Sequence, residues 1–141
     1  MMDVLNLQRK VKLDLDTYRS FVESLSCRVS EAQKRPFTVA FIADARMKQL
    51  NSLFRDKDST TDVLSFPREI DPLEPQNTAL GDVVISAEQA ERQASENKLS
   101  LEAEIKQLIL HGLLHLCGYD HETDKGEMND RELQLRSEMS L

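Results

Sequence analysis

The three histidines of this 141-residue chain lie within eleven residues, at His111, His115 and His121. If the segment up to Cys117 is helical, His111 and His115 lie one turn apart and project from the same face. Gly118 can adopt the left-handed conformation that ends a helix, which would return His121 toward that pair. Three imidazoles around one point, with no fourth ligand nearby in sequence, indicate a metal centre with an open coordination position. This arrangement favours catalysis over a purely structural role.

The alternative is that His111 and His115 are polar interruptions of a core helix, each satisfied by a hydrogen bond. Apolar residues flank both histidines on every side of the predicted helix, and such a segment is buried. Two buried imidazoles one turn apart need a partner, and a metal ion supplies one. Zn²⁺, Ni²⁺ and Fe²⁺ all accept imidazole ligands, so these residues alone leave the metal open. The apolar residues are Leu108, Ile109, Leu110, Leu113, Leu114, Leu116 and Cys117.

The histidine segment must be positioned by the rest of the chain, whose patterns predict strands at 4–15, 37–42, 61–67 and 81–86. Helices are predicted at 16–35, which Pro36 ends, and at 44–54, 87–96, 100–117 and 125–139. Asp44, Ser86 and Ser100 are the predicted N-caps. We therefore expect one α+β domain over residues 1–141. A small mixed sheet of about four strands would pack with helices, and the metal site would lie on a central helix and the following turn.

Composition narrows the class of protein further. The net charge of −7 argues against nucleic-acid binding driven by overall charge, although a local basic groove is compatible with it. The same charge disfavours anionic membrane surfaces. Two cysteines do not make a disulfide framework. Residues 1–16 hold no continuous hydrophobic stretch, so we expect no signal peptide or membrane span and a cytoplasmic protein.

The histidine spacing resembles the His-x-x-x-His-x-x-Gly-x-x-His motif of the metzincin metalloproteases. In those enzymes a glutamate follows the first histidine and acts as the general base. Gly112 stands at that position here and can neither accept a proton nor orient water. The departure argues against peptide hydrolysis by that route.

A second resemblance covers residues 51 to 121. In order along the chain, three segments are similar to those of the bacterial YbeY family, the endoribonuclease-like rRNA maturation factors. The segments are Asn51-Ser52-Leu53-Phe54-Arg55 leading into Thr61-Asp62-Val63-Leu64-Ser65-Phe66-Pro67, then Leu80-Gly81-Asp82-Val83-Val84-Ile85-Ser86, and His111-Gly112-x-Leu114-His115-Leu116-x-Gly118-Tyr119-Asp120-His121. The resemblance implies a zinc-dependent α+β protein of the cytoplasm with one Zn²⁺. It also implies action on 16S ribosomal RNA, including its 3′ end, a role in ribosome quality control, and small-subunit ribosomal proteins as partners.

Arg55 is the candidate catalytic residue. It lies at the predicted end of a helix, just before a strand, and matches the arginine that the family motif places there. On RNA, a metal ion could deliver hydroxide to phosphorus or act as a Lewis acid while the 2′-hydroxyl attacks, and the sequence does not choose between these routes. Both routes place extra negative charge on phosphorus, which a positioned guanidinium would stabilise. The residues nominate no general acid or base, and Asp120 is assigned to orienting His121 or capping a turn.

Three functions remain open from the sequence. The leading hypothesis is a zinc-dependent endoribonuclease in rRNA maturation. The second is a ribosome assembly factor without chemistry, whose metal only shapes the fold and whose acidic surface docks on basic ribosomal proteins. The third, a metallopeptidase, is disfavoured by Gly112.

Overall fold

The computed structural model describes residues 4–120 and 122–141. They form a four-stranded sheet in the order β1-β2-β4-β3, in which β1, β2 and β4 are parallel and β3 pairs antiparallel with β4. The strands are β1 (Val4–Asn6), β2 (Thr38–Ile42), β3 (Val63–Pro67) and β4 (Gly81–Ser86). The helices are α1 (Leu15–Arg28), a 3₁₀ turn (Ser30–Ala32), α2 (Asp44–Arg55), α3 (Ala87–Glu96), α4 (Leu101–Leu116) and α5 (Glu127–Glu138). The predicted α+β class and mixed sheet are confirmed.

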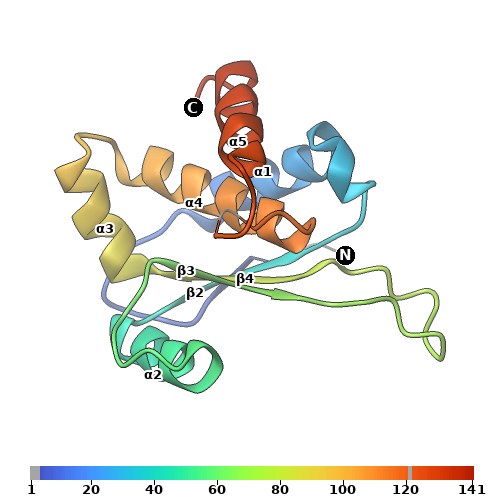
Figure 1. Cartoon of the computed structure of the whole chain (residues 1–141). Coiled ribbons are helices and arrows are strands. Elements are labelled where there is room, and N and C mark those ends of the chain that lie inside the picture. Colours follow the sequence, from blue (N-terminus) through green and yellow to red (C-terminus); the bar gives the residue numbers. More distant parts are fainter. Residues whose placement is uncertain (1–3, 121) are drawn as a thin grey trace.

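The helices are divided unequally between the two faces of the sheet. Figure 1 shows α2 on one face and α1, α4 and α5 on the other. The apolar helix α4 lies at the centre of the main core, where Ile109, Leu113 and Leu114 are fully buried. They belong to the same cluster as Phe41 and Ile85 of the central strands, so the helix that carries His111 and His115 is held by the core itself. On the opposite face, α2 packs over a smaller cluster.

The N-terminal segment departs from the prediction of a strand over 4–15. Strand β1 ends at Asn6, and the Gln8 side chain then closes a turn by bonding both the N–H of Val11 at 2.9 Å and its carbonyl at 2.8 Å. Val11 is buried by this turn and not by sheet pairing. The alternation of Val11, Leu13 and Leu15 with polar residues therefore predicted a strand that does not form.

The first helix is also shorter than the predicted 16–35. Helix α1 ends at Arg28 because Val29 takes an extended backbone conformation (φ −88°, ψ 102°) and is fully buried. A 3₁₀ turn follows, and Gln33 and Lys34 both have positive φ. Together these residues take the chain from α1 to β2 without a continuous helix.

Two of the three predicted helix caps are confirmed. The Ser86 hydroxyl accepts the backbone N–H of Gln89 at 3.2 Å, and the Ser100 hydroxyl accepts that of Ala103 at 3.0 Å. The prediction that Asp44 caps α2 was wrong, since the helix begins at Asp44 and no side chain of its N-cap residue, Ala43, bonds to it.

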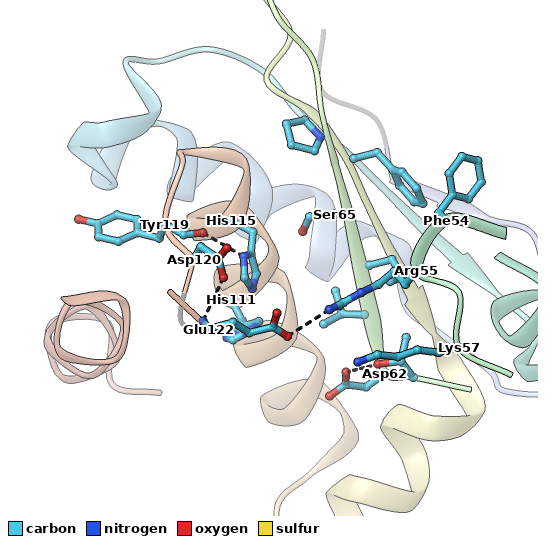
Figure 2. Close-up of a pocket in the computed structure, with 15 residues that line it drawn as sticks. Phe54, Arg55, Lys57, Asp62, Ser65, His111, His115, Tyr119, Asp120 and Glu122 are labelled. Atoms are coloured by element: carbon cyan, nitrogen blue, oxygen red, sulfur yellow. Dashed lines mark hydrogen bonds and ion pairs between the residues drawn. The ribbon is translucent and has the colours of Figure 1, made fainter. Parts of the chain in front are cut away.

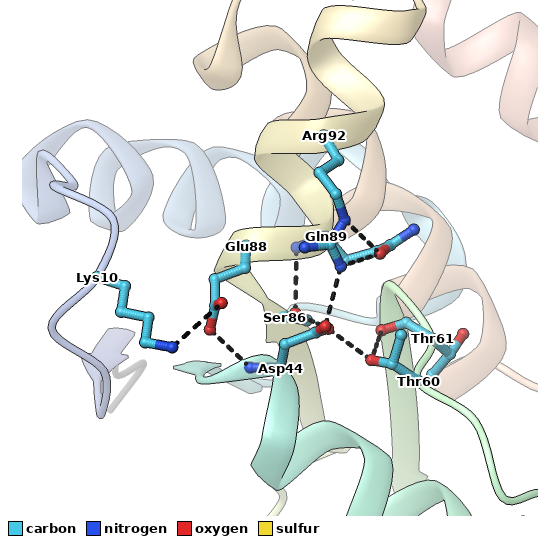
Figure 3. Close-up of polar contacts among 8 residues, drawn as sticks. All are labelled: Lys10, Asp44, Thr60, Thr61, Ser86, Glu88, Gln89 and Arg92. Atoms are coloured by element: carbon cyan, nitrogen blue, oxygen red, sulfur yellow. Dashed lines mark hydrogen bonds and ion pairs between the residues drawn. The ribbon is translucent and has the colours of Figure 1, made fainter.

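Asp44 instead joins α2 to the rest of the protein. Its carboxylate accepts hydrogen bonds from Thr60 at 2.6 Å, Ser86 at 2.9 Å and Arg92 at 2.9 Å. Glu88 accepts the backbone N–H of Asp44 at 2.9 Å, so α3 satisfies one of the N–H groups at the start of α2. Figure 3 shows this junction between the first turns of α2 and α3. No helix in the described residues is long and apolar enough to cross a bilayer.

Candidate functional site

A cavity of about 670 Å³ is bordered by the end of α2, strand β3, the last turns of α4 and the segment after α4. Its lining includes Arg55 at the end of α2, Lys57 just after it, and His111 and His115 from α4. Figure 2 shows the histidines on one side of this pocket and Arg55 extending toward them from the other. The fold therefore brings together the predicted catalytic arginine and two of the three predicted metal ligands.

His111 and His115 lie side by side, with ring centroids 4.9 Å apart. The Nδ1 atom of His111 lies 2.6 Å from a carboxylate oxygen of Glu132, and Nδ1 of His115 lies 3.0 Å from the backbone carbonyl of Tyr119. A carbonyl only accepts hydrogen bonds, so Nδ1 of His115 carries the hydrogen and, in the neutral ring, Nε2 carries the lone pair. Such anchoring of one ring nitrogen is typical of metal-binding histidines.

Glu132, in α5, was not identified from the sequence. Its side chain is nearly buried and bridges His111 to Arg136, whose guanidinium lies 2.6 Å from the second carboxylate oxygen. Burial raises the pKa of this carboxyl, but the hydrogen bond and charge of His111 and the charge of Arg136 outweigh it and hold the pKa below its usual value. Glu132 is therefore a carboxylate that orients His111. The only sequence pattern at Glu132 is its spacing of four residues from Arg136. Such Glu–Arg pairs are common on exposed helices, so the spacing does not indicate a site residue.

Gly112 lets α4 approach the sheet closely. A Cβ atom at this position would lie 2.5 Å from Cγ1 of Val83, which is too close for any side chain. The Ser65 hydroxyl donates a hydrogen bond to the Gly112 carbonyl at 2.9 Å and joins α4 to β3 beside the pocket. The glycine that departs from the metzincin motif is thus required by packing, and a glutamate would not fit there.

Arg55 is the last residue of α2, one residue beyond the predicted helix 44–54, and thus lies at a helix end as expected. Asp56 follows with a left-handed backbone (φ 55°) and ends the helix, which leaves the Arg55 side chain directed into the pocket. Its Nη2 atom lies 3.1 Å from a carboxylate oxygen of Glu122, and both side chains are partly exposed. This ion pair crosses the pocket between α2 and the segment after α4.

A second carboxylate, Glu31, anchors the turn after α4. It accepts the Tyr119 hydroxyl at 2.7 Å and two hydrogen bonds from Arg131, at 2.8 and 2.9 Å. These bonds, led by that of Arg131, lower the pKa of Glu31 to about 2. Because the Tyr119 carbonyl holds His115, the Glu31 cluster indirectly orients that ring. No sequence pattern linked residues so far apart.

The third predicted ligand, His121, lies outside the described residues. Gly118 has the expected positive φ (100°), so the chain does turn after α4. Within 4–120 and 122–141, no three His, Cys, Asp or Glu side chains come together as a metal site. Two imidazoles one turn apart, each anchored through Nδ1, are a donor set that fits a first-row metal ion. The three-histidine centre stays a prediction.

The other acids near the pocket have separate roles. Asp120 accepts the backbone N–H of Glu122 at 3.0 Å, which agrees with the predicted capping of a turn. Asp62 lines the pocket, whereas Asp82 is exposed on β4.

Burial raises the pKa of Cys117 to about 11, which agrees with its place among the apolar residues that flank the histidines.

These features define a small α+β protein whose central His-x-x-x-His helix faces a polar cavity shared with an arginine. The sequence profile described as Endoribonuclease YbeY matches residues 3–140. The chain belongs to this family, which confirms the resemblance found in its motifs.

Individual relatives agree with this assignment. The Endoribonuclease YbeY of Sulfurovum is 35% identical over 144 residues, which cover 100% of this chain and 94% of the relative. That of Nautilia profundicola is 51% identical over 98 residues, or 70% of this chain and 68% of the relative. The solution structure of a Thermotoga maritima protein, 28% identical, superposes with a TM-score of 0.62 and covers 94% of this chain and 85% of that one.

Proposed function

We propose that this protein is a zinc-dependent endoribonuclease that matures ribosomal RNA in the cytoplasm, acts at the 3′ end of 16S rRNA and serves ribosome quality control. The observation that carries the proposal is the shared cavity. Arg55 and the pair His111 and His115 are distant in the sequence, yet they line the same pocket. The relatives are named as endoribonucleases, and these names support endoribonuclease activity for this protein.

His111, His115 and His121 would hold the Zn²⁺ ion. When bound, Zn²⁺ supplies Lewis acidity, which polarises a phosphoryl oxygen or lowers the pKa of a water molecule. The protein prepares its ligands in advance. Glu132 fixes the ring of His111, and the Tyr119 carbonyl fixes that of His115, so neither ring needs to reorient when the ion enters.

Arg55 would bind the scissile phosphate and stabilise the negative charge that grows on its oxygens during cleavage. A guanidinium offers two parallel N–H donors to a phosphate, which a lysine cannot do. The Arg55 donor Nη2 is paired with Glu122, at 3.1 Å. The phosphate would therefore replace Glu122 as the partner of Arg55, and Lys57, on the same wall of the pocket, would add a second positive charge.

The acidic composition favours a second role in ribosome assembly. A net charge of −7 is unsuited to holding RNA by overall attraction, but it suits docking on basic proteins of the small ribosomal subunit. In this role the metal site would stabilise the fold without chemistry. A metallopeptidase activity is not favoured. Val83 leaves no room at Gly112 for the glutamate that acts as general base in the metzincin motif.

The decisive experiment compares two arginine variants on single-stranded rRNA. Arg55→Ala should reduce the cleavage rate about 100-fold or more, the usual effect of losing a charged group that stabilises a transition state. Arg19→Ala is a matched control, because Arg19 also makes one exposed ion pair, with Asp16 at 3.0 Å, but lies on α1 away from the described pocket lining.

Two results would contradict catalysis. One is cleavage that persists in a His111→Ala/His115→Ala preparation, which would identify a contaminating nuclease. The other is an Arg55→Ala protein that cleaves RNA at the wild-type rate. If the wild type cleaves no RNA but binds small-subunit proteins, the assembly role alone stands.

A further inference from the structure

The pocket has two chemically different ends along β3. Asp62 lies just before the strand, and Phe66 and Pro67 form its other end. The five residues of β3 span about 13 Å at the usual strand rise, which exceeds the space that one phosphate group needs. The charged lining groups Arg55 and Glu122 pair across the pocket, whereas Phe54, Phe66 and Pro67 bring no charge to it.

Phe54 is unusual among the large apolar side chains that line this pocket because 64% of its surface is exposed. It makes an edge-to-face contact with Phe66, with ring centroids 5.2 Å apart and planes at 77°. This contact restrains the ring while most of its surface stays accessible to a ligand. Figure 2 shows Phe54 on the far side of Arg55 from Glu122, at the rim of the pocket.

Phe54 and Arg55 are consecutive residues at the end of α2, and both line the pocket. A ligand phosphate held by Arg55 would carry its attached nucleoside next to an exposed aromatic ring. Flat bases stack on such rings with little sequence preference, and each stack contributes about 1–3 kcal/mol to binding. A base paired in a duplex has both its faces covered and cannot stack in this way.

We infer that Phe54, supported by Phe66, is a stacking site for one unpaired RNA base next to the phosphate held by Arg55. The inference rests on the proposed function and names the residue that would contact the base beside the phosphate. Phe54 would hold the base while Arg55 holds the phosphate. Sequence selectivity at this position would be weak, because any of the four bases can stack.

The test measures the binding of a fluorescently labelled single-stranded RNA decamer to the full-length protein. Phe54→Ala should weaken binding about 5- to 100-fold, the range expected for one lost base stack. Phe54→Trp should bind within about threefold of the wild type, because an indole also stacks. Leu53→Ala is the matched control: Leu53 precedes Phe54 on α2, is 75% exposed, and is not among the described residues lining the pocket. It should bind as the wild type does.

A second set of decamers, each with one abasic position, shows whether the lost contact is to a base. At one position, base removal should weaken binding to the wild type and have little effect on Phe54→Ala, because the partner ring is already missing. If Phe54→Ala weakens the binding of every abasic decamer as much as that of the intact one, Phe54 does not stack a base and the inference is wrong.

The outcomes also separate this inference from the proposed function. Equal affinities of the wild type and Phe54→Ala, together with normal RNA cleavage by the wild type, would overturn the stacking site alone. Absence of both RNA binding and cleavage in the wild type would overturn the proposed function and this inference together. Because most of Phe54 is exposed, Phe54→Ala should lower the melting temperature by only a few degrees, through the lost contact with Phe66, and thermal unfolding checks this directly.

Discussion

The carboxylate of Glu132 in α5 lies 2.6 Å from Nδ1 of His111 in α4. This contact connects the C-terminal helix to the candidate metal site and fixes the ring orientation of a predicted ligand. The second carboxylate oxygen, held by Arg136, keeps Glu132 itself in place.

Glu132→Gln should therefore weaken Zn²⁺ binding by about 10- to 100-fold, the usual effect of losing a group that orients a ligand. Competition with a chromophoric zinc chelator measures the dissociation constant. Glu138→Gln is the control, since Glu138 lies on the same helix but is exposed. Equal zinc affinities of Glu132→Gln and the wild type would show that the contact has no role in metal binding.

Glu122→Gln should tighten RNA binding about two- to fivefold at low ionic strength. The exposed ion pair with Arg55 contributes less than about 1 kcal/mol, and a phosphate no longer has to compete with it. Raising the salt concentration should remove the gain. Titrations of labelled RNA in the Arg55→Ala background provide the control, because there Glu122→Gln has no ion pair to release. A gain that persists in that background would assign the effect to charge alone.

Gly112→Ala should destabilise the protein by about 1–3 kcal/mol, although the same change in an exposed helix normally stabilises by about 1 kcal/mol. The added methyl group would lie 2.5 Å from Val83 and force α4 away from the sheet. Urea unfolding measures the free energy, with Ser52→Ala on the exposed surface of α2 as the control. A Gly112→Ala protein as stable as the wild type would mean that the helix and sheet can separate at no cost.

Glu31 should make the free energy of unfolding decrease as the pH is lowered. Its pKa is about 2 in the folded protein and near 4.5 when unfolded, so its contribution is complete above about pH 4.5 and is lost as the pH falls toward 2. For this partly exposed carboxylate we expect a loss of about 1–3 kcal/mol over that interval.

Urea unfolding at pH 5 and pH 3 tests this, with Glu31→Gln losing less stability between the two pH values than the wild type. Glu23→Gln, an exposed change on α1, should behave as the wild type. If the wild type and Glu31→Gln lose the same free energy between pH 5 and pH 3, the link between Glu31, Tyr119 and Arg131 does not stabilise the fold.

Local signals in the sequence predicted most elements of the fold. The β-branched residues of β2, the hydroxyl caps Ser86 and Ser100 and the apolar run of α4 each act within a few residues, so they are readable in order along the chain. The predicted bounds of the strand at 4–15 and the helix at 16–35 were wrong because side-chain contacts, not local sequence patterns, determine where these elements end. Val11 alternates like a strand residue, but the Gln8 turn buries it, and Val29 ends α1 because the core takes its side chain.

The candidate site shows the same division. The pair His111 and His115 and the position of Arg55 followed from helical spacing and from the family motifs. Glu132 and Glu31 could not be predicted, because each meets its partners through the tertiary packing of elements far apart in the chain. A glutamate in an amphipathic helix is usually a solvated residue, and nothing in its neighbours distinguishes one that orients a ligand.

Helix α2 has a polar junction at its first residue and the candidate catalytic side chain at its last. Asp44, its first residue, is tied to Thr60, Ser86 and Arg92, and Arg55 is its last residue. A helix of this length is about 18 Å long, so a tilt of about 10° at the tied end would displace the guanidinium end by about 3 Å. Substitutions at the Asp44 junction that tilt α2 would therefore alter a pocket that they do not contact.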